Sequence, residues 1–98
     1  MLVHSVYFWL NPALTQEQHA AFRQGLESLQ GIETLRFFHV GLPTDSDRPV
    51  VERSYTFALV TCFEDKSGLD TYQVHPLHLA FLDQYKENWE RLQVFDCE

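Results

Sequence analysis

The stretch that decides the fold is Leu2-Val-His-Ser-Val-Tyr-Phe-Trp-Leu10, at the beginning of the sequence. Bulky residues dominate it and alternate as they do in a β-strand. Both sides of this strand are apolar: one carries Leu2, Val6, Phe8 and Leu10, and the other carries Val3, Tyr7 and Trp9. An antiparallel sheet with helices on one side usually presents polar residues on its other side. This strand therefore predicts a sheet that is covered on both faces.

The remaining elements follow the order strand–helix–strand twice. Thr15 and Gln18 form a capping box at the start of the first helix, and Gly31 ends it. Pro76 suits the first turn of the last helix. We therefore expect strands at 2–10, 32–42, 54–64 and 92–97, helices at 15–31, 65–73 and 76–88, and a polar loop at 43–53. The order βαβ–βααβ predicts an α+β, ferredoxin-like fold in one domain, 1–98, with helices on one face of a four-stranded antiparallel sheet.

The second strand is also apolar on both sides. Strict alternation places Leu35 and Phe37 opposite Phe38, Val40 and Leu42. An uncovered sheet of this kind would expose a larger apolar patch than soluble monomers usually carry. The simplest cover is a second copy of the same sheet. We therefore predict a homodimer that packs through an outer sheet face formed by Val3, Tyr7, Trp9, Phe38 and Val40.

The composition limits the partners of the protein. Its 98 residues include 14 Asp and Glu against 7 Lys and Arg, for a net charge of −7, which argues against nucleic acids and anionic membranes. No apolar run reaches the roughly 20 residues that cross a bilayer. The first ten residues lack the features of a signal peptide, so we expect a cytoplasmic protein. Cys62 and Cys97 should lie about 10 Å apart, across two strand spacings, too far for an intrachain disulfide.

The segment Tyr72-Gln-Val-His75-Pro76-Leu-His78 carries the chemistry-bearing side chains. It places two imidazoles and a phenol within seven residues. Histidine exchanges protons near neutral pH. A tyrosine beside it can hold or polarise a substrate oxygen. This segment therefore indicates where a reaction could occur.

Further motifs extend over essentially the whole chain: His4-Ser-Val-Tyr-Phe, Tyr55-Thr-Phe-Ala-Leu-Val, Phe63-Glu-Asp, Tyr72-Gln-Val-His75-Pro76-Leu-His78, and Trp89-Glu-Arg-Leu with Phe95-Asp96. Together these motifs resemble the stress-responsive A/B-barrel (Dabb) domains. The resemblance implies a dimeric α+β barrel.

Members of that family differ in function. Some resemble plant stress proteins without assigned chemistry, and others are cofactor-free polyketide cyclases. In the cyclases the tyrosine and last histidine of the signature act as substrate-binding phenol and acid–base imidazole. These roles carry over to Tyr72 and His78 by resemblance. This chain has Phe57 where the cyclase pattern has polar groups.

Periodicity leads to His78 independently of the resemblance. At helical spacing His78 shares a stripe with Phe81, Leu82, Tyr85 and Trp89, so we expect it to face the sheet. Strand alternation places His4 and Asp96 on one face of their strands, and we expect both to meet His78 at one end of a pocket. A carboxylate on one imidazole nitrogen raises the basicity of the other. Asp96 should therefore orient His78 as proton acceptor, while Tyr72 stabilises an enolate oxygen.

The rest of the predicted pocket is apolar, and no cofactor is expected in it. Its occupant would be a small hydrophobic oxo-compound that undergoes cyclisation, isomerisation or lyase chemistry. Besides His4, we expect these residues to contact the substrate: Val6, Phe8, Phe22, Leu26, Phe57, Leu59, Leu82 and Trp89.

Two other interpretations of these residues stay open. His75 and His78 have i, i+3 spacing and could bind a metal together with His4, although Pro76 places His75 at a helix cap and no carboxylate lies between them. A histidine on an apolar helix face is also often a core residue. The protein would then be a non-catalytic dimer that binds a ligand or acts in stress tolerance by assembling.

Overall fold

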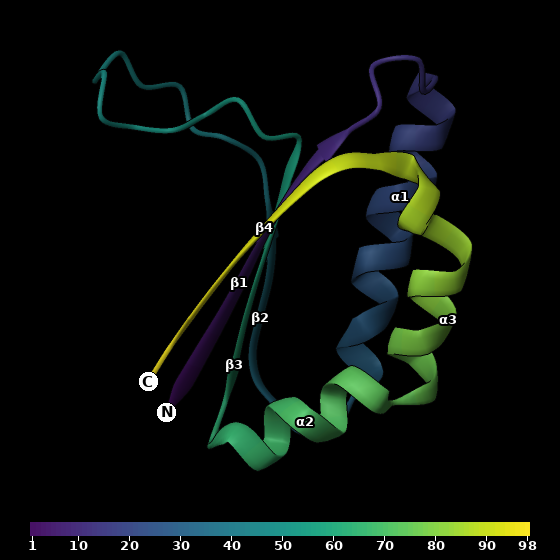
Figure 1. The fold of residues 1–98 in the computed structure, drawn as a ribbon, viewed down its shortest axis with the longest axis vertical. Helices are drawn as coiled ribbons and strands as arrows, with labels where there is room; N and C mark the ends of the chain where they lie inside the picture. The colour runs from purple at the N-terminus through teal and green to yellow at the C-terminus, as the bar shows by residue number, and fades with distance from the viewer.

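The computed structural model describes residues 1–98. It contains β1 (Leu2–Leu10), α1 (Gln16–Glu27), β2 (Leu35–Gly41), β3 (Phe57–Phe63), α2 (Lys66–Val74), α3 (Pro76–Tyr85) and β4 (Trp89–Cys97), with 3-10 turns at Ser28–Gly31 and Lys86–Asn88. The four strands form one sheet in the order β2-β3-β1-β4, and every neighbouring pair is antiparallel. The predicted βαβ–βααβ ferredoxin-like fold is confirmed (Figure 1).

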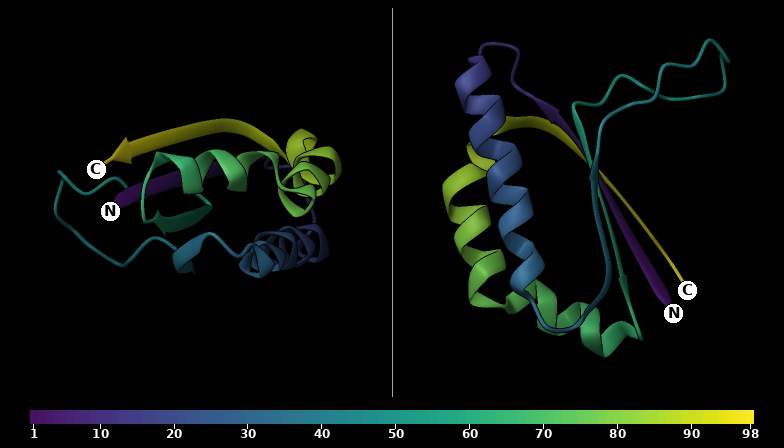
Figure 2. Two further views of the ribbon diagram at one scale, coloured as in Figure 1. Left: turned by 90° about the horizontal axis from the view of Figure 1, so that it is seen from below. Right: turned by 180° about the vertical axis from the view of Figure 1, so that it is seen from behind.

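All three helices lie on one side of the sheet (Figures 1 and 2). Their starting points follow from local sequence. The Thr15 hydroxyl accepts a hydrogen bond from the Gln18 N–H and completes the predicted capping box of α1. Asp65 caps α2 through the N–H of Gly68, and Pro76 opens α3 directly after the cap residue His75. None of the helices is long and apolar enough to pass through a membrane.

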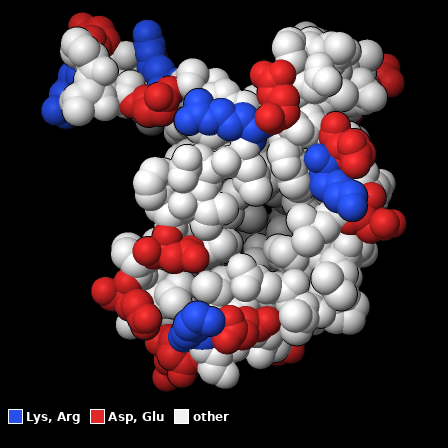
Figure 3. Space-filling view, viewed as in Figure 1, with Lys and Arg blue, Asp and Glu red and all other residues white.

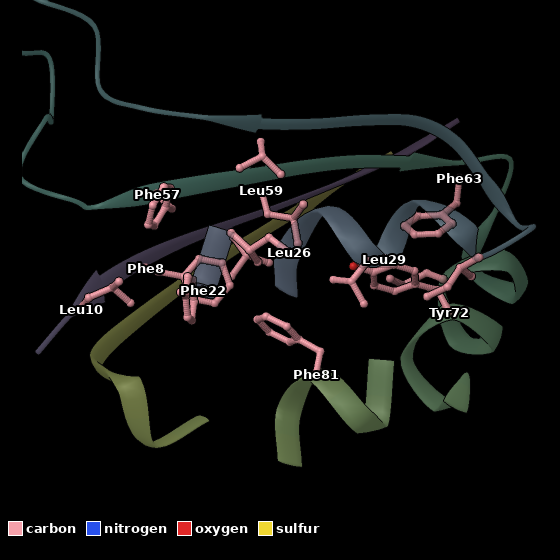
Figure 4. Packing of buried hydrophobic residues seen from close by; sticks show 14 of the residues in the cluster. Phe8, Leu10, Phe22, Leu26, Leu29, Phe57, Leu59, Phe63, Tyr72 and Phe81 are labelled. Carbon is pink, nitrogen blue, oxygen red and sulfur yellow. The ribbon is translucent and has the colours of Figure 1, made fainter. Parts of the chain in front are cut away.

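The core fills the space between the sheet and the helices (Figure 4). Phe22 of α1 is completely buried and contacts the rings of Phe8 and Phe57 at centroid distances of 5.2 and 5.8 Å. Phe81 of α3 closes the same aromatic cluster, 5.6 Å from Phe22. This packing fixes α1 and α3 over β1 and β3.

The opposite face of the sheet, which we call the outer face, has no helix over it (Figure 2). Antiparallel pairing puts Tyr7 beside Ala58 on one side and Gln93 on the other. Val3 lies between Cys62 and Cys97, and both thiols are free. The prediction of Val3, Tyr7 and Trp9 on this face is therefore consistent with the register.

The assignment of Phe38 and Val40 of β2 to the outer face was wrong. A bulge lies between Leu35 and Phe37. An extra residue in a strand reverses the alternation after it. Phe38 and Val40 consequently pair with Thr61 and Leu59 and turn toward the helices, where Val40 belongs to the core. The outer face of β2 carries Phe37 and His39 instead, opposite Cys62 and Val60.

Several boundaries also differ from expectation. Residues 42–56 leave the sheet as an extended segment, here called the arm, so β3 starts at Phe57 and not at 54. The last helix ends at Tyr85, and Trp89 is the first residue of β4. Trp89 therefore reaches the core from the sheet edge rather than from a helical stripe, with its ring 5.3 Å from that of Phe8.

Candidate active site

A cavity of about 150 Å³ lies between the sheet and α2 and α3. Figure 3 shows the hollow between the sheet and the helices, where the surrounding atoms belong to neither Lys, Arg, Asp nor Glu. The cavity reaches solvent at the edge strand β4, where the lining residues Leu92 and Val94 are 41% and 39% exposed. The lining consists of His4, Val6, Phe8, Leu29, Leu59, Tyr72, Gln73, His78, Phe81, Leu82, Trp89, Leu92 and Val94.

His78 reaches this cavity from the first turn of α3. Its Nδ1 atom is buried and has no hydrogen-bond partner. Burial lowers the pKa of the imidazole, the nearby His4 lowers it further, and the backbone of Gln73 opposes these effects. His78 is therefore uncharged at neutral pH and carries an unshared electron pair, as a general base requires.

Tyr72 lies beside His78, with ring centroids 4.9 Å apart. It projects from α2 toward Leu29 in the interior (Figure 4) and is completely buried. Its hydroxyl oxygen also lacks a hydrogen-bond partner. Burial raises the pKa of this phenol well above its usual range, so the hydroxyl keeps its proton and can donate a hydrogen bond to an oxyanion.

Asp96 does not orient His78, contrary to the sequence-based expectation. Its carboxylate forms a hydrogen bond with Nδ1 of His4, a buried residue on the neighbouring strand. The register explains this choice, because His4 and Asp96 are paired directly across β1 and β4. The pair lies next to the Tyr72 ring, whose centroid is 6.2 Å from that of His4.

The structure brings part of the predicted set of pocket residues together around the cavity. His4, Val6, Phe8, Leu59, Leu82 and Trp89 line the cavity together with Tyr72 and His78. Phe22, Leu26 and Phe57 do not, because they pack against one another in the aromatic core next to it.

Five lining residues were not predicted as such: Leu29, Gln73, Phe81, Leu92 and Val94. Leu92 and Val94 carried a usable signal, since they alternate with Asp96 and so share its face.

His75 lies apart from this group. Its Nδ1 accepts the N–H of Leu77 at 3.1 Å, and its Nε2 lies 3.3 Å from a carboxylate oxygen of Glu33. It thus serves as the cap of α3. Both ring nitrogens of His75 therefore contact groups other than His4 and His78.

The fold and the pocket define a class: a ferredoxin-like α+β protein with a buried tyrosine and a half-buried histidine in a pocket between the sheet and the helices. The comparison with protein families gives the same result. Residues 2–98 match the family described as stress responsive A/B barrel domain. The chain therefore belongs to the stress-responsive A/B barrel (Dabb) family.

Individual relatives add detail. Olivetolic acid cyclase from Cannabis sativa is 38% identical over 45 residues, which span 46% of this chain and only 45% of the cyclase. A dimeric ferredoxin-like protein of unknown function from Thermobifida fusca superimposes with a TM-score of 0.80 at 24% identity, over 98% of this chain and 88% of that one. Hydroxynitrile lyase from Passiflora edulis gives 0.79 at 20% identity, over 98% and 90%.

Proposed function

We propose that this protein is a small homodimer whose sheet–helix pocket binds a small hydrophobic oxo-compound and catalyses proton transfer on it without a cofactor. The carrying observation is the pair of unpartnered polar atoms, Tyr72 Oη and His78 Nδ1, in a pocket that is otherwise almost entirely apolar. An unsatisfied buried polar group costs about 1–3 kcal/mol. A ligand that supplies both missing partners accounts for their presence.

The two atoms have complementary roles. His78 Nδ1 takes a proton from a carbon next to the carbonyl group, and the C–H electron pair moves into the enolate. The oxygen that becomes negative accepts a hydrogen bond from the Tyr72 hydroxyl. His78 then returns the proton to carbon in an isomerisation, to the new alkoxide oxygen in an aldol cyclisation, or to a leaving group in an elimination. Aldol-type cyclisation, keto–enol isomerisation and elimination next to a carbonyl all share the first step.

The size of the cavity limits the ligand. A cavity of about 150 Å³ holds a molecule the size of benzene, whereas drug-sized ligands occupy about 300–1,000 Å³. Phe81 and Trp89 stack with centroids 6.2 Å apart and close the inner end. A longer tail would have to leave past Leu92 and Val94. We therefore expect a ring-sized body at the reacting end.

The charge of the cavity limits the ligand as well. No lining residue is Lys or Arg, and the nearby carboxylate of Asp96 is hydrogen-bonded to His4. A carboxylate or phosphate on the buried part of the substrate would lack a counter-charge. The buried part is therefore neutral, which suits an aldehyde, a ketone or their hydroxy adducts.

The homodimer rests on the outer face of the sheet. Phe37 and Phe95 lie there with half or more of their surface exposed. The structural neighbour from Thermobifida fusca is a dimer. A second copy packed on this face removes the apolar surface from water and leaves the pocket, on the opposite side of the sheet, accessible.

Hydrogen–deuterium exchange at carbon tests the proposal without knowledge of the natural substrate. Neutral ring-sized ketones and 1,3-diketones are incubated with the protein in deuterated buffer, and loss of the α-proton signal is followed by NMR. We expect exchange above the buffer rate that disappears in His78→Gln and falls strongly in Tyr72→Phe. His19→Gln is the control, because His19 lies against Phe57 outside the cavity.

The outcomes separate the candidate functions. Exchange that persists in His78→Gln would contradict the assigned base. Binding of the same compounds without exchange in the wild type would instead identify a non-catalytic ligand-binding dimer.

A further inference from the structure

The arm, residues 42–56, is the least packed part of the chain. None of its residues is buried, and Leu42 and Val50 expose 57% and 77% of their surface. Loops longer than about 12–15 residues are uncommon in compact domains unless they have a function. Figures 1 and 2 show the arm on the side of the sheet away from the helices. It therefore borders the outer face, not the pocket.

The base of the arm is firmly attached to β1. The Thr56 N–H donates to the carbonyl of Phe8 at 2.7 Å, and the Thr56 hydroxyl accepts the N–H of Leu10 at 3.0 Å. The Trp9 indole N–H donates to the Ser54 hydroxyl at 3.0 Å. An ion pair of 3.0 Å between Arg53 and Asp45 links the two limbs. The three hydrogen bonds therefore attach the base of the arm to β1.

A slot of about 440 Å³ lies between this base and the outer face. Arg91 stacks on Trp9, with its guanidinium carbon 4.1 Å from the ring centroid. Tyr7 packs against Tyr55 with ring centroids 5.0 Å apart. The slot is lined by Tyr7, Trp9, Glu52, Tyr55, Arg91, Gln93 and Phe95. Aromatic rings and arginine are the residue types enriched at the centres of protein interfaces.

We propose that the arm is a clasp: in the homodimer, which this inference takes from the proposed function, each arm closes over the second copy and the slot receives part of that copy. Two observations favour a second copy of this chain as the occupant. The slot is continuous with the apolar outer face, which the proposed dimer covers. The arm, which has two exposed apolar residues in Leu42 and Val50, projects on that side of the sheet.

A matched pair of valines tests the clasp. Val50 on the arm and Val74 at the end of α2 are similarly exposed, at 77% and 68%, but Val74 lies on the helix side of the sheet and outside the arm. Sedimentation velocity over a dilution series gives the dimer dissociation constant of each variant. We expect Val50→Asp to raise that constant by about tenfold or more and Val74→Asp to leave it unchanged.

A second variant covers the case in which one charge is tolerated. Residues 44–51 are replaced by the same number of Gly and Ser residues, which removes the contacts of the arm and keeps its base. The dimer should again weaken while the circular dichroism stays that of the wild type. If both arm variants dimerise like Val74→Asp, the proposed clasp is contradicted and the proposed dimer is not. If the wild type itself is a monomer at micromolar concentration, both the dimer and the clasp are contradicted.

Discussion

The two faces of the sheet use the same kind of apolar strand in different ways. On the inner face, helices cover the strands completely except at one cavity, where Tyr72 Oη and His78 Nδ1 lack partners. On the outer face, the strands are also largely apolar, yet no helix covers them, and the base of the arm contacts only the end that carries Tyr7 and Trp9. In the proposed function, a ligand completes the inner face and a second copy of the chain covers the outer face.

This difference assigns a separate role to each face. Unpartnered polar atoms reduce stability and are kept where a function requires them. Uncovered apolar surface reduces solubility and is kept where a partner covers it. The predictions below test this division, from the largest expected effect to the smallest.

Truncation of the inner core should give the largest effect. Phe22→Ala removes a completely buried ring from the centre of the aromatic cluster, and we expect a loss of about 3–5 kcal/mol in the free energy of unfolding. The loss should not depend on protein concentration. Phe95→Ser on the outer face, measured by the same chemical denaturation, should weaken stability only at concentrations where the dimer forms. Equal behaviour of the two variants would remove the distinction between the faces.

Helix packing over the inner face gives the next prediction. A Cβ atom added at Gly25 in α1 would collide with the ring of Tyr85, whereas one added at Gly68 in α2 would lie an ordinary 3.4 Å from Phe63 Cβ. Gly25→Ala should therefore cost about 1–3 kcal/mol through overpacking. Gly68→Ala should be neutral or stabilising by up to about 1 kcal/mol, because alanine favours the helix. Thermal melts of both variants test this; a harmless Gly25→Ala would show that α1 and α3 are loosely packed.

The His4–Asp96 pair provides a smaller effect. Asp96→Ala leaves the buried Nδ1 of His4 without its partner, at an expected cost of about 1–2 kcal/mol. Asp70→Ala removes an exposed i, i+4 partner of Lys66 and should cost less than about 0.5 kcal/mol. Urea denaturation of the two variants measures both losses in the free energy of unfolding. Similar values for the two variants would mean that Asp96 contributes no more than a surface charge.

The smallest effect concerns pH. The pKa of His78 is lowered in the folded protein by burial, so the unfolded chain binds more protons once the pH falls below the unfolded value of about 6.5. Stability from this group is complete above that pH and is lost as the pH falls toward the folded pKa. His78→Gln should therefore lose less stability than the wild type between about pH 7.5 and 5.5. Identical slopes in melts across this range would contradict the burial of an uncharged imidazole.

Much of the fold could be predicted from the sequence because its signals are local. The alternation of β1, the capping box at Thr15 and the position of Pro76 each fix one element without reference to the others. The face of β2 could not be predicted in this way. A single bulge reverses every side chain after it, and no residue type marks its position.

The candidate site could also be predicted only in part. Periodicity correctly placed His78, His4 and Asp96 on inward faces. It could not decide which imidazole Asp96 would bind, because that depends on strand register, and the register pairs Asp96 with His4. Phe22 and Phe57 also face inward, but the depth of the aromatic core separates them from the cavity. Periodicity identifies which face of a strand or helix points inward, but it does not show how far from the cavity an inward side chain lies.

The most direct test of the central claim, that the inner face keeps unpartnered polar atoms for a ligand, is the thermal melt of Tyr72→Phe. The substitution removes only a buried hydroxyl that has no hydrogen-bond partner. If the hydroxyl serves a ligand, its loss should leave the melting temperature unchanged or raise it by a few degrees, up to about 4–8 °C for each kcal/mol recovered. A melting temperature several degrees below that of the wild type would show that the hydroxyl stabilises the fold, and would contradict the account.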